Sequence, residues 1–184
     1  MLPKELCFTY SEYKDFPPDD KRYEILEGRL LMVPSPFIPH QSMSRNIELC
    51  LYNYVKEKNL GKIFNAPCDV ILSEINVVQP DIIFVSNEKI NIITYKNIKG
   101  APDLLIEILS DSSKKNDTET KKKIYAQSNV KEYWIVDPEE KNIKVFTNLK
   151  KRYVLWKEFF EVDLLSTPAF PELKMNLKEV LSWP

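Results

Sequence analysis

Two carboxylates interrupt apolar runs that are otherwise suited to buried strands, and this conflict constrains the chain more than any other feature. Asp81 opens the run Asp-Ile-Ile-Phe-Val, and Glu107 lies inside Leu-Leu-Ile-Glu-Ile-Leu at residues 104–109. Both runs are rich in branched apolar residues, which predicts β-strands. A charge in a central strand costs several kcal/mol unless it is paired or binds a metal. Each carboxylate therefore needs a partner, and a structural salt bridge or an edge-strand position remains the alternative to a functional role.

The two carboxylates gain a joint role if their strands are neighbours in one sheet. Asp81 and Glu107 can then converge on one point. Carboxylate oxygens are hard ligands, which magnesium and manganese prefer. The pair therefore predicts a site for a divalent metal.

Hydrophobic periodicity predicts a mixed architecture around these strands. Residues 22–33 alternate apolar and polar positions across a turn at Glu27-Gly28, which predicts a hairpin. Between residues 40 and 58, apolar side chains recur at spacings of three and four, which predicts a one-sided helix. The other expected elements are strands over 69–72 and 132–136, a helix over 117–128, a hairpin from 143–146 and 153–156, and a short helix after Pro168. This order favours an α/β (α+β) fold, with a central mixed β-sheet flanked by helices and an N-terminal hairpin.

Length and composition set the domain organisation. The chain has 184 residues, of which 43% are hydrophobic and only three are glycine, so it can bury one sizeable core. The turn-rich stretch at residues 15–20 predicts an N-terminal leader over 1–20, followed by a single domain over 21–184. The charges nearly cancel, with 26 basic against 27 acidic residues, so any nucleic-acid contact has to use a local patch.

Several common kinds of active site are disfavoured. Gly28, Gly61 and Gly100 stand alone, so the chain has no Gly-rich phosphate loop. The single histidine, His40, disfavours a His-based zinc enzyme, and no Gly-x-Ser-x-Gly motif accompanies it as in many serine hydrolases. Carboxylates and lysines remain as the candidate catalytic groups.

The cysteines and apolar segments bear on the compartment. Cys7, Cys50 and Cys68 are odd in number and widely spaced, which argues against a disulfide framework and a structural zinc site. The first ten residues lack the apolar segment of a signal peptide, and the apolar runs are too short to span a bilayer. We therefore expect a soluble, cytoplasmic protein with reduced cysteines and no membrane partner.

An ordered set of motifs gives the chain a specific resemblance. The motifs are Tyr-Glu-Ile-Leu-Glu-Gly at 23–28, His-Gln at 40–41, Val-Val-Gln-Pro-Asp at 77–81, Gly-Ala-Pro-Asp-Leu-Leu-Ile-Glu-Ile-Leu-Ser at 100–110, the segment 121–125, and Glu-Tyr-Trp-Ile-Val-Asp-Pro at 132–138. Together they resemble the Uma-type putative restriction endonuclease family, part of the PD-(D/E)xK nuclease superfamily. The resemblance covers residues 23–153 and implies a restriction-endonuclease-like core.

The resemblance also implies roles for particular residues. Asp81 and Glu107 would hold a divalent metal, Mg²⁺ with Mn²⁺ as the alternative, and a lysine would position or activate the attacking water. The superfamily usually places that lysine two residues after the acidic residue, where this chain has Leu109. In this family a lysine from the following helix is thought to substitute, and Lys121 matches that position.

Helical spacing agrees with this role for Lys121. Asp117, Lys121 and Tyr125 lie four residues apart and share one helix face, so Lys121 can point toward the sheet. Lys122 and Lys123 then point elsewhere. The alternative for Lys121 is a solvated residue in a basic run.

Three further residues are expected to line the site. Glu24 matches an acidic residue that the family keeps after a tyrosine and is assigned a catalytic role; the alternative is a hairpin surface charge paired with Arg22 or Arg29. Gln79 lies two residues before the first metal carboxylate and is expected on the same strand face. His40 is expected to contact phosphate or water, and its alternative is a polar residue at a helix start.

A basic run adjoins the proposed site. Its lysines are Lys114, Lys115, Lys121, Lys122 and Lys123. We expect this patch to contact phosphates and count Lys122 among the substrate-binding residues; a solvated loop and helix face is the alternative. Phosphate contacts would make binding weaken steeply with salt.

The sequence as a whole predicts a Mg²⁺-dependent endonuclease that hydrolyses DNA phosphodiester bonds, with RNA left open as a substrate. A homodimer is expected, because cutting both strands of a duplex favours paired active sites. One alternative is a catalytically inactive nuclease-fold protein that binds nucleic acid or assembles with a partner, and Leu109 sustains it. Another is a metal-dependent phosphoesterase that acts on small nucleotides.

Overall fold

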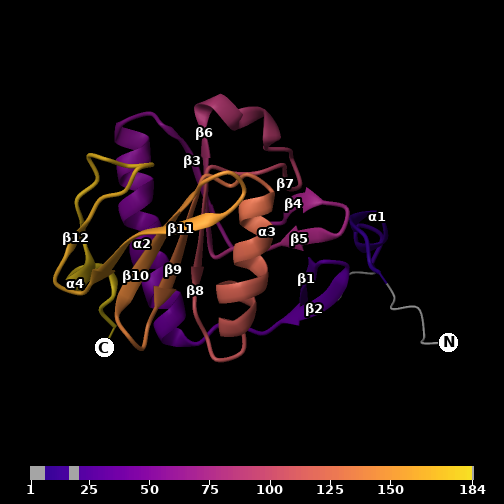
Figure 1. Cartoon of the computed structure of the whole chain (residues 1–184), viewed down its shortest axis with the longest axis horizontal. Helices are drawn as coiled ribbons and strands as arrows, with labels where there is room; N and C mark the ends of the chain where they lie inside the picture. The colour runs from indigo at the N-terminus through magenta and orange to yellow at the C-terminus, as the bar shows by residue number, and fades with distance from the viewer. Residues whose placement is uncertain (1–6, 17–20, 184) are drawn as a thin grey trace.

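The computed structural model describes residues 7–16 and 21–183 and arranges them in two main β-sheets with helices packed against them (Figure 1). The leader expected over 1–20 lies partly outside the described residues, including part of its turn-rich stretch, residues 17–20. Its described part contains the short helix α1 (Tyr10–Tyr13). Tyr13 and other aromatic residues of this segment pack against a small core that includes Ile25.

A six-stranded mixed sheet forms the centre of the fold. Its strands are β3 (Gly61–Asn65), β6 (Ile82–Ser86), β8 (Leu104–Ile108), β9 (Glu132–Asp137), β10 (Asn142–Asn148) and β11 (Tyr153–Phe160). They lie in the order β11-β10-β9-β8-β6-β3. The β8–β9 pair is parallel and the other neighbours are antiparallel, which confirms the predicted mixed sheet. Strand β3 was not predicted.

Alternation along these strands sorts their side chains between two cores. In β6, β8 and β9, even-numbered residues such as Ile106 and Trp134 lie in one core with the long helix α2 (Ile38–Glu57), which confirms the predicted one-sided helix. Odd-numbered residues such as Leu105 pack in a second core on the opposite face. Successive side chains of a strand point to opposite faces, so the odd-numbered Glu107 lies on the side away from α2.

A helical crossover joins the parallel pair β8 and β9 on the face opposite α2 (Figure 1). It consists of the π-helical segment η2 (Asn116–Lys121) followed by α3 (Lys122–Gln127), which confirms the helix predicted over 117–128. Asn129 follows with φ 65°, the left-handed conformation that commonly ends a helix. This crossover carries Lys121 back toward the sheet.

The N-terminal hairpin belongs to a second sheet. Its strands are β1 (Arg22–Leu26), β2 (Arg29–Val33), β4 (Val70–Ser73), β5 (Asn76–Val78) and β7 (Ile98–Lys99). The order β2-β1-β5-β4-β7 places the predicted hairpin at one edge. Strands β5 and β7 were not predicted, nor was the 3-10 helix η1 (Asn87–Ile92). The second sheet contributes residues such as Val70 and Val78 to the core that contains Leu105.

The C-terminal segment folds back on the α2 side of the central sheet. It contains β12 (Leu164–Leu165), β13 (Met175–Asn176) and the short helix α4 (Leu177–Val180). Phe170 and Leu177 are fully buried in the core beneath α2, which confirms the predicted packing.

The cysteines and the longest helices can be located in the described residues. Cys7, Cys50 and Cys68 are all free thiols. Among the residues that the structure describes, no helix has the length and apolar character needed to cross a bilayer.

Candidate active site

The two predicted metal carboxylates are brought together by the register of β6 and β8. These strands are antiparallel, with Ile82 opposite Ile106, so Asp81, immediately before β6, lies beside Glu107. Oδ2 of Asp81 accepts a hydrogen bond of 2.8 Å from the backbone N–H of Ile108. The carboxylate of Asp81 is therefore tied directly to the strand that carries Glu107.

Lys121 points from the crossover into a group of carboxylates. Its Nζ lies 3.0 Å from Oε1 of Glu24, 3.1 Å from Oε1 of Glu107 and 3.3 Å from Oδ1 of Asp117. All four side chains are buried, and that of Lys121 is only 6% exposed. The alternative of a solvated lysine is therefore wrong, and Lys121 lies where the resemblance requires a lysine.

The π-helical turn explains how Asp117 and Lys121 share this position. Both are the buried residues of η2, and they form an ion pair four residues apart. π-Helical turns are rare and occur frequently at functional sites. The sequence predicted the shared face but not the π-helical geometry.

Tyr125 completes the surroundings of Glu107. Its hydroxyl donates a 2.6 Å hydrogen bond to Oε1 of Glu107, the same oxygen that Lys121 contacts. Tyr125 is fully buried, and burial raises its pKa well above the ordinary value, as do the nearby Glu107 and Glu24. The phenol therefore stays protonated and acts as a donor that holds Glu107.

Glu24 and Gln79 join the second sheet to the site. Oε1 of Glu24 accepts the backbone N–H of Gln79 at 2.8 Å. The side chain of Gln79 accepts from Nε of Arg22 at 2.9 Å and donates to Asp69 at 2.8 Å. Asp69 also accepts from the hydroxyl of Tyr13. Glu24 is thus buried and paired with Lys121, not with Arg22 or Arg29 as the surface alternative held.

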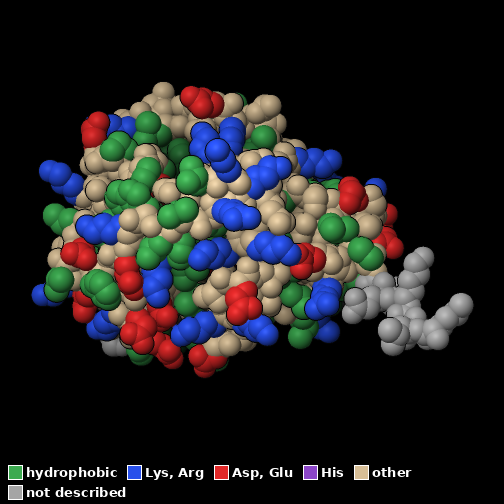
Figure 2. Space-filling model, in the orientation of Figure 1, with side chains coloured by type: hydrophobic (Ala, Val, Ile, Leu, Met, Phe, Trp, Pro, Cys, Tyr) green, Lys and Arg blue, Asp and Glu red, His purple; other side chains and the backbone are tan. Residues whose placement is uncertain are grey.

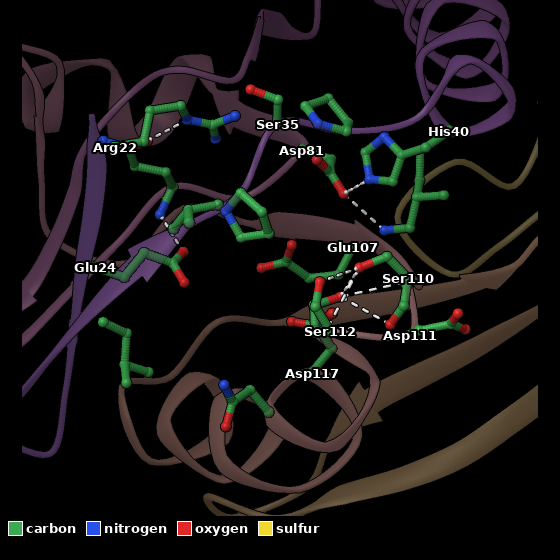
Figure 3. Close-up of a pocket in the computed structure, with 18 of the residues that line it drawn as sticks. Arg22, Glu24, Ser35, His40, Asp81, Glu107, Ser110, Asp111, Ser112 and Asp117 are labelled. Carbon is green, nitrogen blue, oxygen red and sulfur yellow. Dashed lines mark hydrogen bonds and ion pairs between the residues drawn. The ribbon is translucent and has the colours of Figure 1, made fainter. Parts of the chain in front are cut away.

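His40 approaches the site from the first turn of α2. Its Nε2 lies 3.1 Å from Oδ2 of Asp81, whereas its Nδ1 is buried without a hydrogen-bond partner among the described residues. In Figure 3, His40 and Asp81 lie side by side on one side of the pocket, with Glu24 across from them. The helix-start position alone does not account for this contact between α2 and the carboxylate.

Lys122 is the predicted site residue that the structure places elsewhere. Its Nζ lies over the ring of Phe146, 3.7 Å from the centroid, and Lys122 does not line the pocket. Its neighbour Lys123 pairs with Glu27. Figure 2 shows Lys and Arg side chains gathered over the face where Figure 1 draws α3 and β11. Lys121 is the lysine nearest the site, but it is buried among carboxylates and is therefore not part of this exposed basic surface.

These residues surround a pocket of about 420 Å³. One part of its wall is polar and contains Glu24, Asp81, Glu107, Asp117 and Lys121. Figure 3 shows the carboxylates of Glu24, Asp81 and Glu107 arranged around one space, with Ser110 and Ser112 near Glu107. The volume lies within the range of small-ligand pockets, about 300–1,000 Å³.

Burial and charge determine the pKa values in the pocket. Burial raises the pKa of Glu107 well above its usual range despite the opposing effect of Lys121, and the neighbouring carboxylates add to the increase. Burial likewise raises the pKa of Asp117. Burial alone would lower the pKa of Lys121, but Glu107, Glu24 and Asp117 outweigh it and hold that pKa well above its ordinary value. Lys121 is therefore a permanent ammonium group that cannot neutralise all of its neighbours.

The comparisons with known proteins bear on the family and the fold. The family model described as "Uma2: Putative restriction endonuclease" matches residues 10–178. The chain belongs to the Uma2 family. A crystal structure titled as a putative nuclease belonging to DUF820 from Anabaena variabilis has a TM-score of 0.79 and 22% sequence identity, and the match covers 96% of this chain and 98% of that chain. At this identity the likeness shows the fold. Curated proteins give no match.

Members of a nuclease family of this fold generally use divalent metal ions, and the donor set in this Uma2 chain suits one. In the described part of the chain, no three His, Cys, Asp or Glu side chains form a ready-made metal cage. Mg²⁺ typically takes only one or two carboxylates, with water and substrate phosphate as its remaining ligands. Asp81 engages its neighbours through Oδ2 and Glu107 through Oε1, so the pair has a second oxygen each for a cation. The residues therefore fit Mg²⁺ or Mn²⁺.

Sequence reasoning missed several polar residues of the Uma2 site. Asp117 was expected only to share a face with Lys121, and Tyr125 only to face inward, yet both contact the central cluster. The signal for both was their spacing of four residues from Lys121. Asp69 gave no such signal, because its contact with Gln79 depends on the pairing of β4 with β5.

Proposed function

We propose that this chain is a Mg²⁺-dependent endonuclease that hydrolyses DNA phosphodiester bonds. One observation carries the proposal: Asp81 and Glu107 lie side by side on adjacent strands, and the ammonium group of Lys121 is 3.1 Å from Glu107. This combination of two carboxylates and a lysine in one pocket is the set that the nuclease superfamily uses. The Uma2 family description supports the same activity.

Asp81 and Glu107 would hold the metal through the oxygens that face the pocket. When bound, the cation offsets the charge that builds on the phosphate and lowers the pKa of a coordinated water. His40 and the backbone N–H of Ile108 fix Asp81, and Tyr125 fixes Glu107. These contacts keep both carboxylates in one orientation before the substrate arrives.

Lys121 would act as a cationic hydrogen-bond donor. Its raised pKa keeps it protonated at neutral pH, so it cannot remove a proton from water. An ammonium group beside Glu107 can instead orient the attacking water and stabilise negative charge on the phosphate. Glu24 and Asp117 hold Lys121 in place from either side.

Replacement of the usual strand lysine by Leu109 is consistent with this arrangement. Leu109 is buried in the apolar core on the crossover side, where a charged side chain would lack water. Lys121 brings its ammonium to the second metal carboxylate from the crossover. The absence of a lysine at position 109 is also consistent with the alternative, a catalytically inactive nuclease-fold protein that binds nucleic acid.

We further infer that the protein works in the cytoplasm as a homodimer with one active site in each protomer. The exposed lysines beside the site, including Lys115 and Lys123, would contribute phosphate contacts that weaken with salt. Lys122 would contact phosphates outside the pocket, since its ammonium lies over Phe146.

The test is cleavage of supercoiled and single-stranded DNA with Mg²⁺, Mn²⁺ or chelator. Wild type, Glu107→Ala and Lys121→Ala are compared with Lys58→Ala, an exposed lysine that pairs with Glu172 on the surface. Metal-dependent cleavage that is lost in the first two variants and retained in Lys58→Ala supports the proposal. Activity that survives in Lys121→Ala alone removes the role of this lysine. Absence of cleavage by the wild type supports the inactive alternative, and hydrolysis of small phosphodiesters alone supports a phosphoesterase.

A further inference from the structure

The pocket has two chemically different walls. Besides the buried carboxylates, its lining includes the end of β2, the segment that leads into α2, and the polar Arg22 and Ser35. We name four of these residues the apolar lip: Met32, Pro34, Pro36 and Phe37. They have no charge and no side-chain hydrogen-bonding group. A ligand that fills this pocket therefore has one anionic or polar side and one flat or apolar side.

The large apolar side chains of the apolar lip are mostly exposed to solvent. Phe37 is 77% exposed and Met32 is 62% exposed, and the adjacent Ile38 is 76% exposed. Two large exposed apolar side chains, Met32 and Phe37, that line one pocket differ from single exposed apolar residues, which are normal. By contrast, Glu24 and Glu107 in the same pocket are 5% and 3% exposed. The buried carboxylates thus form the floor of the pocket, and the exposed apolar groups form part of its rim, where the half-buried Arg22 also contributes to the lining.

The backbone of the apolar lip is held in place. The two prolines restrict its φ angles. The side chain of Gln41 donates a 3.1 Å hydrogen bond to the carbonyl of Pro36, and the backbone N–H of Gln41 donates to the carbonyl of Phe37. Little conformational entropy would be lost when a ligand packs on a segment fixed in this way. The exposed ring of Phe37 is a preformed contact surface.

A nucleotide within an unpaired strand matches these two walls. Its phosphate suits the floor once the carboxylates hold a cation, and its base is a flat ring that aromatic side chains stack on. In an intact duplex the base faces are already stacked on their neighbours, so an exposed aromatic rim gains nothing unless the strand is locally opened. The buried position of Glu107 points the same way, because a flexible strand can bring one phosphate to a pocket floor more readily than a paired helix can.

We propose that the apolar lip, through Phe37, stacks on a base next to the scissile phosphate, so that the enzyme acts on single-stranded or locally unpaired DNA in preference to intact duplex. The proposal rests on the nuclease function proposed above and adds its substrate class. The substrate is recognised by base stacking at the rim and by phosphate at the floor. Phe37 is the residue that determines the preference.

Binding provides a test that does not depend on turnover. The probe is a short oligodeoxynucleotide that contains the fluorescent base 2-aminopurine, as a single strand and in a fully paired duplex, with Ca²⁺ as the cation and the strand confirmed to remain intact. Wild type should bind the single strand about tenfold more tightly than the duplex, with a change in fluorescence. Phe37→Ala should weaken single-strand binding by about tenfold, and Phe37→Tyr should restore it.

Tyr95→Ala is the matched control. Tyr95 is a fully exposed aromatic residue that does not line the pocket, so its removal should leave binding unchanged. Equal binding by wild type and Phe37→Ala overturns the proposal, as does a preference for intact duplex. A comparable loss in Tyr95→Ala also overturns it, because the effect would then be general to exposed aromatic residues.

Cleavage of the same oligonucleotides with Mg²⁺ separates this proposal from the nuclease function. If wild type and Phe37→Ala cut duplex and single strand equally well, the role of the apolar lip is wrong and the nuclease function stands. If binding depends on Phe37 but neither Mg²⁺ nor Mn²⁺ supports cleavage, the apolar lip stands as a single-strand binding surface and the nuclease function is wrong. If wild type binds no nucleic acid, both proposals are wrong and the apolar lip has another partner.

Discussion

The two ends of the central strands both bury carboxylates, but they satisfy them in opposite ways. At the end away from the site, Asp103 accepts the backbone N–H of Ser86 at 2.9 Å and lies 2.8 Å from Nζ of Lys131 and 3.4 Å from Nζ of Lys89. One carboxylate there faces two ammonium groups. At the site end, Lys121 is shared among three carboxylates.

Glu132 lies at the end that carries Asp103 and is satisfied by neutral donors. Its two oxygens accept hydrogen bonds from Nε1 of Trp134 at 2.7 Å and from the backbone N–H of Ala169 at 3.0 Å. Asp103 and Glu132 even line a pocket of about 570 Å³, so the presence of a pocket does not separate the two ends. The difference is the excess of negative charge around Glu107, which indicates a cation site.

The pKa values of Asp103 and Glu107 differ in the same sense, although burial also raises the pKa of Glu132. Burial pushes the pKa of Asp103 upward, but Lys131, the N–H of Ser86 and Lys89 outweigh it and hold that pKa below its ordinary value. At the site end, burial has a larger effect than the nearby Lys121, and the pKa of Glu107 is raised well above its usual range. Asp103 is thus neutralised by neighbouring cations, whereas Glu107 is only partly neutralised.

The largest predicted effect is on cleavage activity, and it distinguishes the carboxylates at the two ends of the central strands. Glu107→Gln keeps the side-chain shape but removes a metal ligand, so cleavage should fall on the order of 1,000-fold. Asp103→Asn should cleave as well as the wild type, since Asp103 lies outside the catalytic pocket. Rates of plasmid nicking with Mg²⁺ measure both. A loss of cleavage of similar size in Asp103→Asn would contradict the predicted difference between the two ends.

Removal of the shared cation should have the next largest effect. Lys121→Met leaves buried carboxylates without their counter-ion, so the free energy of unfolding should decrease by about 3–5 kcal/mol at neutral pH. Lys123→Met removes an exposed lysine that pairs with Glu27 and should cost less than about 1 kcal/mol. Urea unfolding measures both values. Equal stability of Lys121→Met and wild type would show that the cluster does not need its ammonium group.

Tyr125→Phe should have an intermediate effect. It removes the 2.6 Å hydrogen bond to Glu107 and should lower the free energy of unfolding by about 1.5–3 kcal/mol. If Tyr125 positions Glu107, cleavage should also fall by about 10- to 100-fold, with a higher Mg²⁺ concentration needed for half-maximal activity. Lost stability with an unchanged Mg²⁺ requirement would leave Tyr125 with a structural role alone.

The smallest predicted effect is the pH dependence of Asp103. Its pKa is lowered in the folded state, so its stabilising contribution is present above the unfolded-state pKa, near about 4, and disappears as pH falls through the folded-state pKa. Asp103→Asn should therefore be about 1 kcal/mol less stable than wild type at pH 7, and the two should converge at acidic pH. Urea unfolding at several pH values checks this, and a constant difference would contradict it.

The sequence predicted those features that depend on local periodicity. The alternation in β8 placed Glu107 on a definite strand face, and the helical spacing aimed Lys121 at that face. Asp103 lies four residues before Glu107, so the same period of two puts it on the same face, but a period does not say which end of a strand becomes the site. Four residues of strand separate the two by about 13 Å, which is enough to place them in different pockets.

The features that were not predicted depend on contacts between distant segments. Strand β3 has few apolar residues, because as an edge strand it pairs with a neighbour on one side only. The second sheet combines β1 with β5, whose three residues are too few to show alternation. The pair of His40 with Asp81 joins α2 to the start of β6, and no local pattern predicts such a pair.

The most direct test of the charge contrast is Mn²⁺ binding measured by titration calorimetry or electron paramagnetic resonance. Wild type, the double variant Asp81→Asn with Glu107→Gln, and the double variant Asp103→Asn with Glu132→Gln would be compared under the same conditions. The account predicts that Mn²⁺ binds to the wild type and to the Asp103 and Glu132 variant, and that binding is lost in the Asp81 and Glu107 variant. Binding that survives the loss of Asp81 and Glu107, or that depends on Asp103 and Glu132, would contradict it.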